Sequence, residues 1–138
     1  MGISTKADIA YDAIRANKSD VPIIAEKTGI KPSNIEKVKN HLFYERHLLD
    51  RYIEYGIPPE MRRFDSDIAI VQFWKRLESG AFTSQDIQLL RHEIAEAWYM
   101  RRQGPSYTAA HNAAHARYPA PDLEQMLDYE RKLTPPLT

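Results

Sequence analysis

Apolar residues recur along most of the chain at the three- and four-residue spacing of amphipathic helices. The pattern predicts a first helix over residues 5–16 and a second over 21–28, where Gly29 provides a left-handed helix end. A third helix is predicted from residue 33 and is expected to continue as far as residue 55. It ends before the Gly-Ile-Pro-Pro stretch at 56–59, because proline cannot continue the hydrogen-bond ladder of a helix.

The second half of the chain shows the same helical pattern, interrupted by glycine and proline. Helices are predicted over 65–79, 83–103 and 106–117, and a short final helix begins at 121. The last residues, 133–138, contain two adjacent prolines and are expected to be extended or disordered. Sustained alternation of apolar and polar residues, which is typical of strands, is almost absent.

These predictions define an all-α fold, a compact single-domain bundle of about six or seven helices. The domain is assigned to residues 1–132 and the tail to residues 133–138. Its N-terminal corner, over residues 21–42, has the form of a helix-turn-helix.

The composition narrows the class of protein further. Of the 138 residues, 43% are hydrophobic and 28% are charged, which is ordinary for a globular domain and excludes disorder of the whole chain. Nineteen basic residues balance nineteen acidic ones, which argues against a dedicated nucleic-acid coat. The absence of cysteine excludes disulfides, thiolate metal sites and cysteine nucleophiles. No apolar run reaches the ~20 residues that span a bilayer, so we expect no membrane partner and a cytoplasmic location.

The helix-turn-helix corner makes a DNA-binding regulator one alternative for the function. The residues expected to face outward from its second helix are Lys31, Ser33, Asn34, Lys37 and Lys39. Among these, Lys31, Asn34 and Lys37 suit contacts with phosphates and base edges. Any short helix–glycine–helix corner has the same spacing, however, and the balanced charge offers no wider basic face for DNA.

Charge-capable side chains lie within the apolar pattern of the predicted helix over 83–103 and of the helix that follows it. His92 and Glu96 are four residues apart on one helix face, and Glu93 lies close by. His111 and His115 share a face of the next helix. A short Gly-Pro turn joins the two helices, so antiparallel packing is expected to gather these groups in one solvent-accessible cleft.

Histidines and carboxylates in one cleft suit general acid–base catalysis, because imidazole titrates near neutral pH and a carboxylate can orient it. Taken alone, His115 and Glu93 are more typical of a solvated helix face. The string His-Glu-x-x-Glu resembles the zinc motif His-Glu-x-x-His, but Glu96 replaces the second histidine. We therefore expect no cofactor, and a divalent metal would need an atypical ligand set such as His92, Glu96 and His111.

Two other segments carry residues that could complete such a site. His41 lies near the end of an apolar helix face, and we expect it to join the catalytic cluster. Arg62 and Arg63 are candidates for binding a substrate phosphate or carboxylate, since guanidinium binds such groups in a bidentate way. Asp65 is a candidate catalytic residue, with a helix N-cap as the simpler interpretation.

One pattern connects the candidate residues. It comprises Lys39-Asn40-His41, Arg63-Phe64-Asp65, the stretch from Trp74 to Gly80, Asp86-Ile87, Leu89-Leu90, His92-Glu93, Glu96, Met100 and Ala110-His111. The pattern resembles a small C-terminal domain of bacterial polymorphic toxins, of the contact-dependent-inhibition and Rhs types, and of some phage minor head proteins. It covers about residues 30–118, and Ser66 stands where such domains often have a proline.

The resemblance implies an effector that is delivered to a target-cell cytoplasm as part of a larger protein and is neutralised by a cognate immunity protein. Domains of this kind differ in chemistry, so we infer the reaction from the residues. The prediction is a hydrolase that cleaves a phosphodiester, in RNA rather than in DNA, by histidine and glutamate acid–base chemistry. The alternatives are the helix-turn-helix regulator and a non-catalytic phage or adaptor interaction module.

Overall fold

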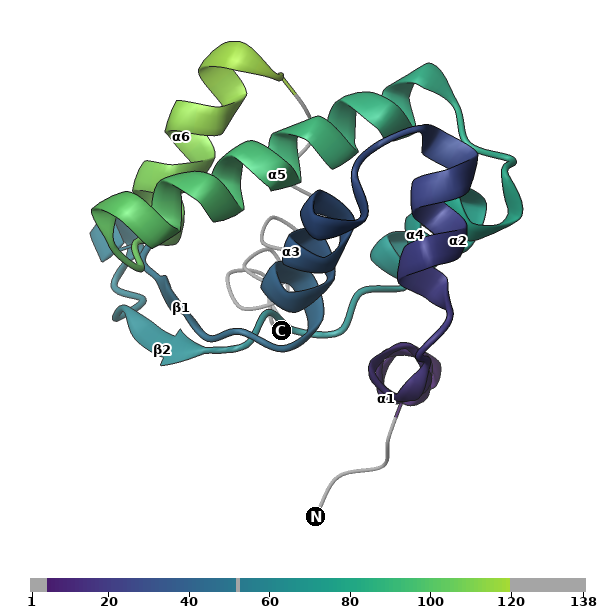
Figure 1. Ribbon diagram of the computed structural model, residues 1–138. Helices are drawn as coiled ribbons and strands as arrows, with labels where there is room; N and C mark the ends of the chain where they lie inside the picture. The colour runs from purple at the N-terminus through teal and green to yellow at the C-terminus, as the bar shows by residue number, and fades with distance from the viewer. Residues whose placement is uncertain (1–4, 52, 120–138) are drawn as a thin grey trace.

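The computed structural model describes residues 5–51 and 53–119, and helices make up most of this part of the chain (Figure 1). The helices are α1 (Lys6–Ala16), α2 (Asp20–Thr28), α3 (Pro32–Phe43), α4 (Ile68–Ser79), α5 (Ser84–Gln103) and α6 (Tyr107–Arg117). The prediction of a compact all-α domain is confirmed. The helix predicted from residue 121 and the tail at 133–138 lie outside the described residues.

Local sequence signals explain where most of these helices begin and end. At the start of α5, the Thr83 side chain accepts a hydrogen bond from the backbone of Asp86 and the Asp86 side chain returns one, which forms a capping box. Glycines in the left-handed region end α2 and α4, with φ of 75° at Gly29 and 82° at Gly80. These three signals agree with the predicted boundaries.

The third helix is shorter than predicted. It ends at Phe43, and the following residues form strand β1 (His47–Leu49), a 3₁₀ turn (Ile53–Tyr55) and strand β2 (Glu60–Arg62). The two strands pair antiparallel. The prediction of a continuous helix to residue 55, without strands, was therefore wrong.

Contacts with a distant part of the chain explain why β1 replaces a helix. The backbone N–H of Leu48 donates to the carbonyl of Pro105 at 2.8 Å, and the Leu49 side chain is buried. Asp50 accepts hydrogen bonds from the Ser106 hydroxyl at 2.6 Å and from the backbone N–H of Thr108 at 3.0 Å. The hairpin therefore fixes the turn between α5 and α6.

Helix α5 runs across the molecule, with α3 packed against it and α6 turning back beside it after Gly104 (Figure 1). An ion pair fixes its N-terminal end to α4, because the Arg76 guanidinium donates to both Asp86 oxygens, at 2.8 and 2.9 Å. This pairing lowers the pKa of Asp86. Helices α3, α5 and α6 therefore meet around the middle of α5.

The α2–α3 corner does form a helix-turn-helix shape around Gly29, but its second helix is not free to enter a groove. α3 packs against both α2 and α5, and its C-terminal half is buried. Lys31 and Lys37 are exposed, whereas Lys39 is 6% exposed and faces inward. The expectation that Lys39 faces outward was wrong. No helix among the described residues is long and apolar enough to cross a bilayer.

A buried polar group holds α2, α3 and α4 together. Asp20 accepts hydrogen bonds from the Lys39 ammonium at 2.8 Å and from the Trp74 indole N–H at 3.0 Å. Lys39 also donates to the Asn17 carbonyl at 2.7 Å. Because the charged groups are buried, the pair has to be complete for the corner to be stable.

We predict that Asp20→Ala lowers the free energy of unfolding by about 3–5 kcal/mol, because it leaves the Lys39 ammonium buried without its carboxylate. Urea unfolding measures the change. Asp12→Ala is the control, since Asp12 forms an exposed ion pair with Arg15 on the surface of α1, and we expect it to cost less than about 1 kcal/mol. Equal losses in the two variants would contradict the role of Asp20.

Candidate functional site

Five titratable side chains from three helices meet in the interior. They are His41 of α3, His92, Glu93 and Glu96 of α5, and His111 of α6, and we call them the histidine–glutamate cluster. His111 is 5% exposed and the other four are fully buried. The structure therefore brings together five of the six residues predicted to be catalytic.

The carboxylate of Glu96 lies at the centre of this cluster. Its Oε1 accepts a hydrogen bond from Nε2 of His41 at 2.7 Å, and its Oε2 lies 3.0 Å from Nε2 of His92. Nδ1 of His111 lies 3.5 Å from the same Oε2. Burial raises the pKa of Glu96, but the hydrogen bonds with the three imidazoles outweigh burial and hold the pKa well below its usual range.

His92 links the central carboxylate to α6 and to the backbone that follows α6. Its Nδ1 donates to the carbonyl of Tyr118 at 3.0 Å, and its Nε2 lies 3.1 Å from Nδ1 of His111. Burial lowers the pKa of His92, but the hydrogen bond to Glu96 and the charges of Glu93 and Glu96 outweigh burial and raise it to about 9.

Glu93 is buried, which corrects the expectation that it lies on a solvated face. One of its oxygens lies 3.5 Å from Nε2 of His41, so it adds a second carboxylate to the cluster. His115 is exposed, as that expectation had it. Its ring stacks against His111 with centroids 5.6 Å apart, and it is therefore the surface neighbour of the cluster.

Sequence reasoning did not single out His47, a buried residue of β1 beside the cluster. Its Nε2 donates to the backbone carbonyl of His41 at 2.8 Å, and its ring stacks on Phe64. Burial, together with the smaller effect of the neighbouring His41, lowers the pKa of His47 to about 4. The alternating burial of β1 could have identified it only if the strand had been recognised.

The predicted substrate-binding residues lie outside the cluster, beside a surface hollow. Arg15, Arg46, Arg62 and Arg63 line it, and we call it the arginine hollow. Its volume is about 560 Å³, and Phe64 forms part of its wall. Phe64 also contacts the His41 ring, with centroids 5.5 Å apart, so this side chain is in contact with both the hollow and the cluster.

Asp65 does not join the cluster. Its carboxylate accepts a hydrogen bond from Arg62 at 2.6 Å at the arginine hollow. The N-cap of α4 is Asp67, whose side chain accepts from the backbone N–H of Ala69. Both interpretations of Asp65, as a catalytic group in the cluster and as the cap, therefore differ from the structure.

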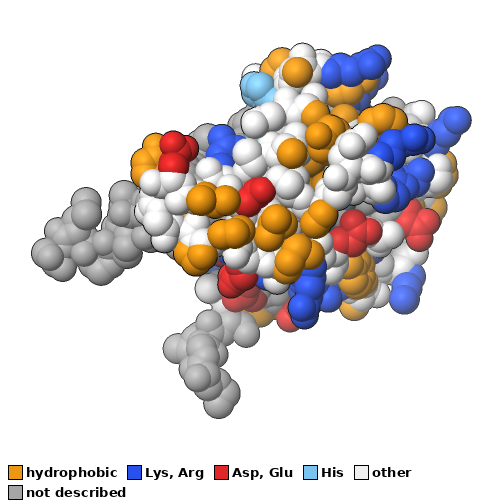
Figure 2. All heavy atoms as spheres, turned by 90° about the vertical axis from the view of Figure 1, so that its left-hand side faces the viewer, with side chains coloured by type: hydrophobic (Ala, Val, Ile, Leu, Met, Phe, Trp, Pro, Cys, Tyr) orange, Lys and Arg blue, Asp and Glu red, His pale blue; other side chains and the backbone are white. Residues whose placement is uncertain are grey.

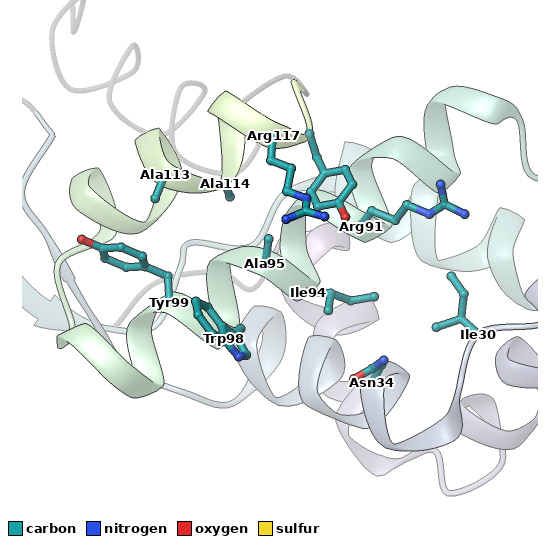
Figure 3. Close-up of a pocket in the computed structure, with 11 residues that line it drawn as sticks. Ile30, Asn34, Arg91, Ile94, Ala95, Trp98, Tyr99, Ala113, Ala114 and Arg117 are labelled. Atoms are coloured by element: carbon teal, nitrogen blue, oxygen red, sulfur yellow. The ribbon is translucent and has the colours of Figure 1, made fainter.

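A second hollow lies on the outer face of α5, between α3 and α6 (Figure 3). Apolar side chains such as Ile94 and Trp98 line most of it, with Arg91 and Arg117 at its polar side. Among the candidate DNA-binding residues, Asn34 lines this hollow. None of the residues that line this hollow belongs to the histidine–glutamate cluster.

The cluster does not form the solvent-accessible cleft that the sequence pattern predicted. Four of its side chains have no exposed surface, and very little histidine surface is visible on the face of the molecule in Figure 2. The antiparallel helices gather the imidazoles and carboxylates as expected, but aliphatic and aromatic neighbours cover them. Any substrate therefore needs local opening of the structure to reach them.

Two overlapping sets of donor atoms within the cluster have the composition of a metal site. One consists of His92, Glu96 and His111, and the other of His41, Glu93 and Glu96. In each set the donor atoms lie within 4.8 Å of one another.

Comparison of the chain with protein-family models, with curated proteins and with solved structures found no match.

We predict that His47 makes stability depend on pH between about 6.5 and 4. The unfolded chain binds a proton at this histidine below pH 6.5, whereas the folded chain does not until about pH 4, so stability falls as the pH falls. Urea unfolding should show that the wild type loses about 2 kcal/mol more than His47→Gln between pH 7 and pH 4.5.

His115→Gln is the matched control for this measurement, because His115 is exposed. Its pH dependence should follow that of the wild type. The assignment fails if His47→Gln retains the full pH dependence of the wild type.

Proposed function

We propose that the domain is a hydrolase that cleaves phosphodiesters, with RNA as the preferred substrate, and that the histidine–glutamate cluster is its reaction centre. The observation that carries the proposal is the convergence of three imidazoles on the buried carboxylate of Glu96. Burying such groups costs free energy, so their concentration in one place is a signal of function.

The geometry suits transfer of protons between paired groups. The ring nitrogens of His92 and His111 lie 3.1 Å apart, and Glu96 orients both rings. Cleavage of RNA requires removal of a proton from the attacking hydroxyl and donation of one to the leaving oxygen, and two imidazoles can divide these tasks. We assign the pair His92 and His111 to this step and Glu96 to its orientation.

The arginine hollow supports an anionic substrate. Four arginines and two aspartates, Asp8 and Asp65, line this space next to Phe64, so basic groups outnumber acidic ones. Guanidinium groups bind phosphate with directed hydrogen bonds. Phe64 lies between this space and His41, so its displacement would open a path from the hollow to the cluster. We propose that phosphates bind to Arg62 and Arg63 and that the chain opens beside Phe64.

The proposal retains the toxin-like effector class for the domain, with a cognate immunity protein as its partner. The support for this class is the sequence resemblance, which includes the cluster residues His41, His92, Glu93, Glu96 and His111. An enzyme whose reaction centre is buried until the chain opens locally is also suited to inhibition, because a partner that prevents this opening would block the reaction.

We predict that the purified domain cleaves RNA and that His92→Gln and His111→Gln each lower kcat/KM by about 100-fold or more, since positioned acid–base groups contribute at least that much. Gel electrophoresis of labelled RNA measures cleavage, and circular dichroism checks that each variant folds. Expression of the wild type, but not of these variants, should slow the growth of the host cells.

His115→Gln is the matched control, because it removes an exposed histidine from the same helix as His111. It should cleave RNA at a rate close to that of the wild type. Equal cleavage by the wild type and His92→Gln would show that the cluster takes no part in the reaction. A folded wild type that cleaves neither RNA nor DNA would contradict the proposed hydrolase activity.

A further inference from the structure

Three donor atoms in the cluster lie close to one another. They are Nε2 of His92, Oε2 of Glu96 and Nδ1 of His111, and their separations are 3.0, 3.1 and 3.5 Å. Bonds of about 2.0–2.1 Å in a tetrahedral zinc site place neighbouring ligand atoms about 3.3 Å apart. The observed triangle therefore has the dimensions of one face of such a site.

Inside the triangle the three atoms hydrogen-bond with one another, and the Tyr107 hydroxyl lies 3.3 Å from Nδ1 of His111, so a bound ion would replace the protons that these bonds share. His92 donates its Nδ1 proton to the Tyr118 carbonyl, so Nε2 is the nitrogen that would bind an ion once its own proton is released. Glu96 uses Oε1 to accept from His41, which leaves Oε2 inside the triangle. Metal-binding histidines and carboxylates are typically fixed in this way by outer hydrogen bonds to carbonyl groups and to other side chains.

The charges in the cluster also favour a cation at this position. Glu93 and Glu96 are two carboxylates with no exposed surface, and the partners of Glu96 among the described residues are the three histidines. A divalent ion would balance two carboxylate charges that burial otherwise makes costly. It would also take the place of the hydrogen bond between the two ring nitrogens, which lie 3.1 Å apart.

We propose that His92, Glu96 and His111 bind one divalent transition-metal ion, with zinc as the best-suited ion. Two imidazoles and one carboxylate form a ligand set that zinc accepts, and three protein ligands leave a fourth position for water. His41 and the Tyr118 carbonyl position the ligands from outside. The site uses the same two imidazole nitrogens as the proton transfer proposed above, so an ion bound there would replace that transfer. Its bound water, with a lowered pKa, would then supply a nucleophile.

The other donor sets are less suitable. Nε2 of His41 is only 2.7 Å from Oε1 of Glu96, which is the distance of a hydrogen bond and is shorter than the expected ligand separation. In a further set, His41, Glu45 and His47, Nε2 of His47 already donates to the His41 carbonyl. We therefore assign His41 to the outer hydrogen bonds and place the ion on the His111 side.

Titration of zinc chloride into the full chain tests the site. The protein should be purified without a polyhistidine tag and stripped with a chelator, and calorimetry should then give one ion per chain with a Kd below about 1 µM. His92→Gln should weaken binding by at least about 100-fold. His41→Gln should weaken it by about 10- to 100-fold, which is the usual effect of losing an outer partner.

His115→Gln is the matched control and should bind zinc like the wild type. X-ray absorption at the zinc edge of the wild type gives a readout that does not depend on a variant that folds, and it should show imidazole ligands. The proposed zinc site is contradicted if the folded wild type does not bind zinc or if the bound ion has only oxygen ligands. It is also contradicted if His115→Gln loses zinc binding while His92→Gln retains it.

The result also separates this site from the hydrolase. Zinc binding by a protein that cleaves no phosphodiester supports the metal site and removes the proposed activity. Cleavage of a phosphodiester by a protein that does not bind zinc supports the proposed activity and contradicts the metal site.

Discussion

The structure depends on one buried carboxylate. Glu96 has no exposed surface, and hydrogen bonds with histidines keep its pKa well below the usual range of a glutamate. An ionised carboxylate in the interior is stable only when its surroundings compensate for the lost water. The compensation comes from one residue on each of three helices, so the position of Glu96 sets how α3, α5 and α6 pack.

The rest of the fold holds these partners in place. α3 is fixed on two sides within one turn, because Lys39 bonds to Asp20 of α2 and His41 bonds to Glu96 of α5. The β1–β2 hairpin connects to the turn before α6 through Asp50, which bonds to Ser106. Polar contacts with strict geometry thus position the helices, and the aromatic core fills the space between them.

The sequence predicted the helices well because their signals are local. The capping box at Thr83 and the glycines that end α2 and α4 depend only on neighbouring residues. The pairing of His92 with Glu96 and His111 also followed from helical spacing and a short turn.

Features set by distant contacts could not be predicted in the same way. The strand at His47 depends on a bond to Pro105, and the inward position of Lys39 depends on Asp20. The burial of Glu93 depends on how α3 covers α5. For this reason helical spacing predicted that His92, Glu96 and His111 lie together, whereas the burial of the cluster was not predicted.

NMR of the histidine ring nitrogens in the metal-free protein tests the central role of Glu96 most directly. The chain has five histidines, and we expect ring N–H protons at Nε2 of His41 and Nδ1 of His92 to exchange slowly with water. Glu96→Gln should shift the His41 and His92 signals and leave those of His115 unchanged. Rings of His41 and His92 that exchange as fast as His115, or that do not respond to Glu96→Gln, would contradict the account.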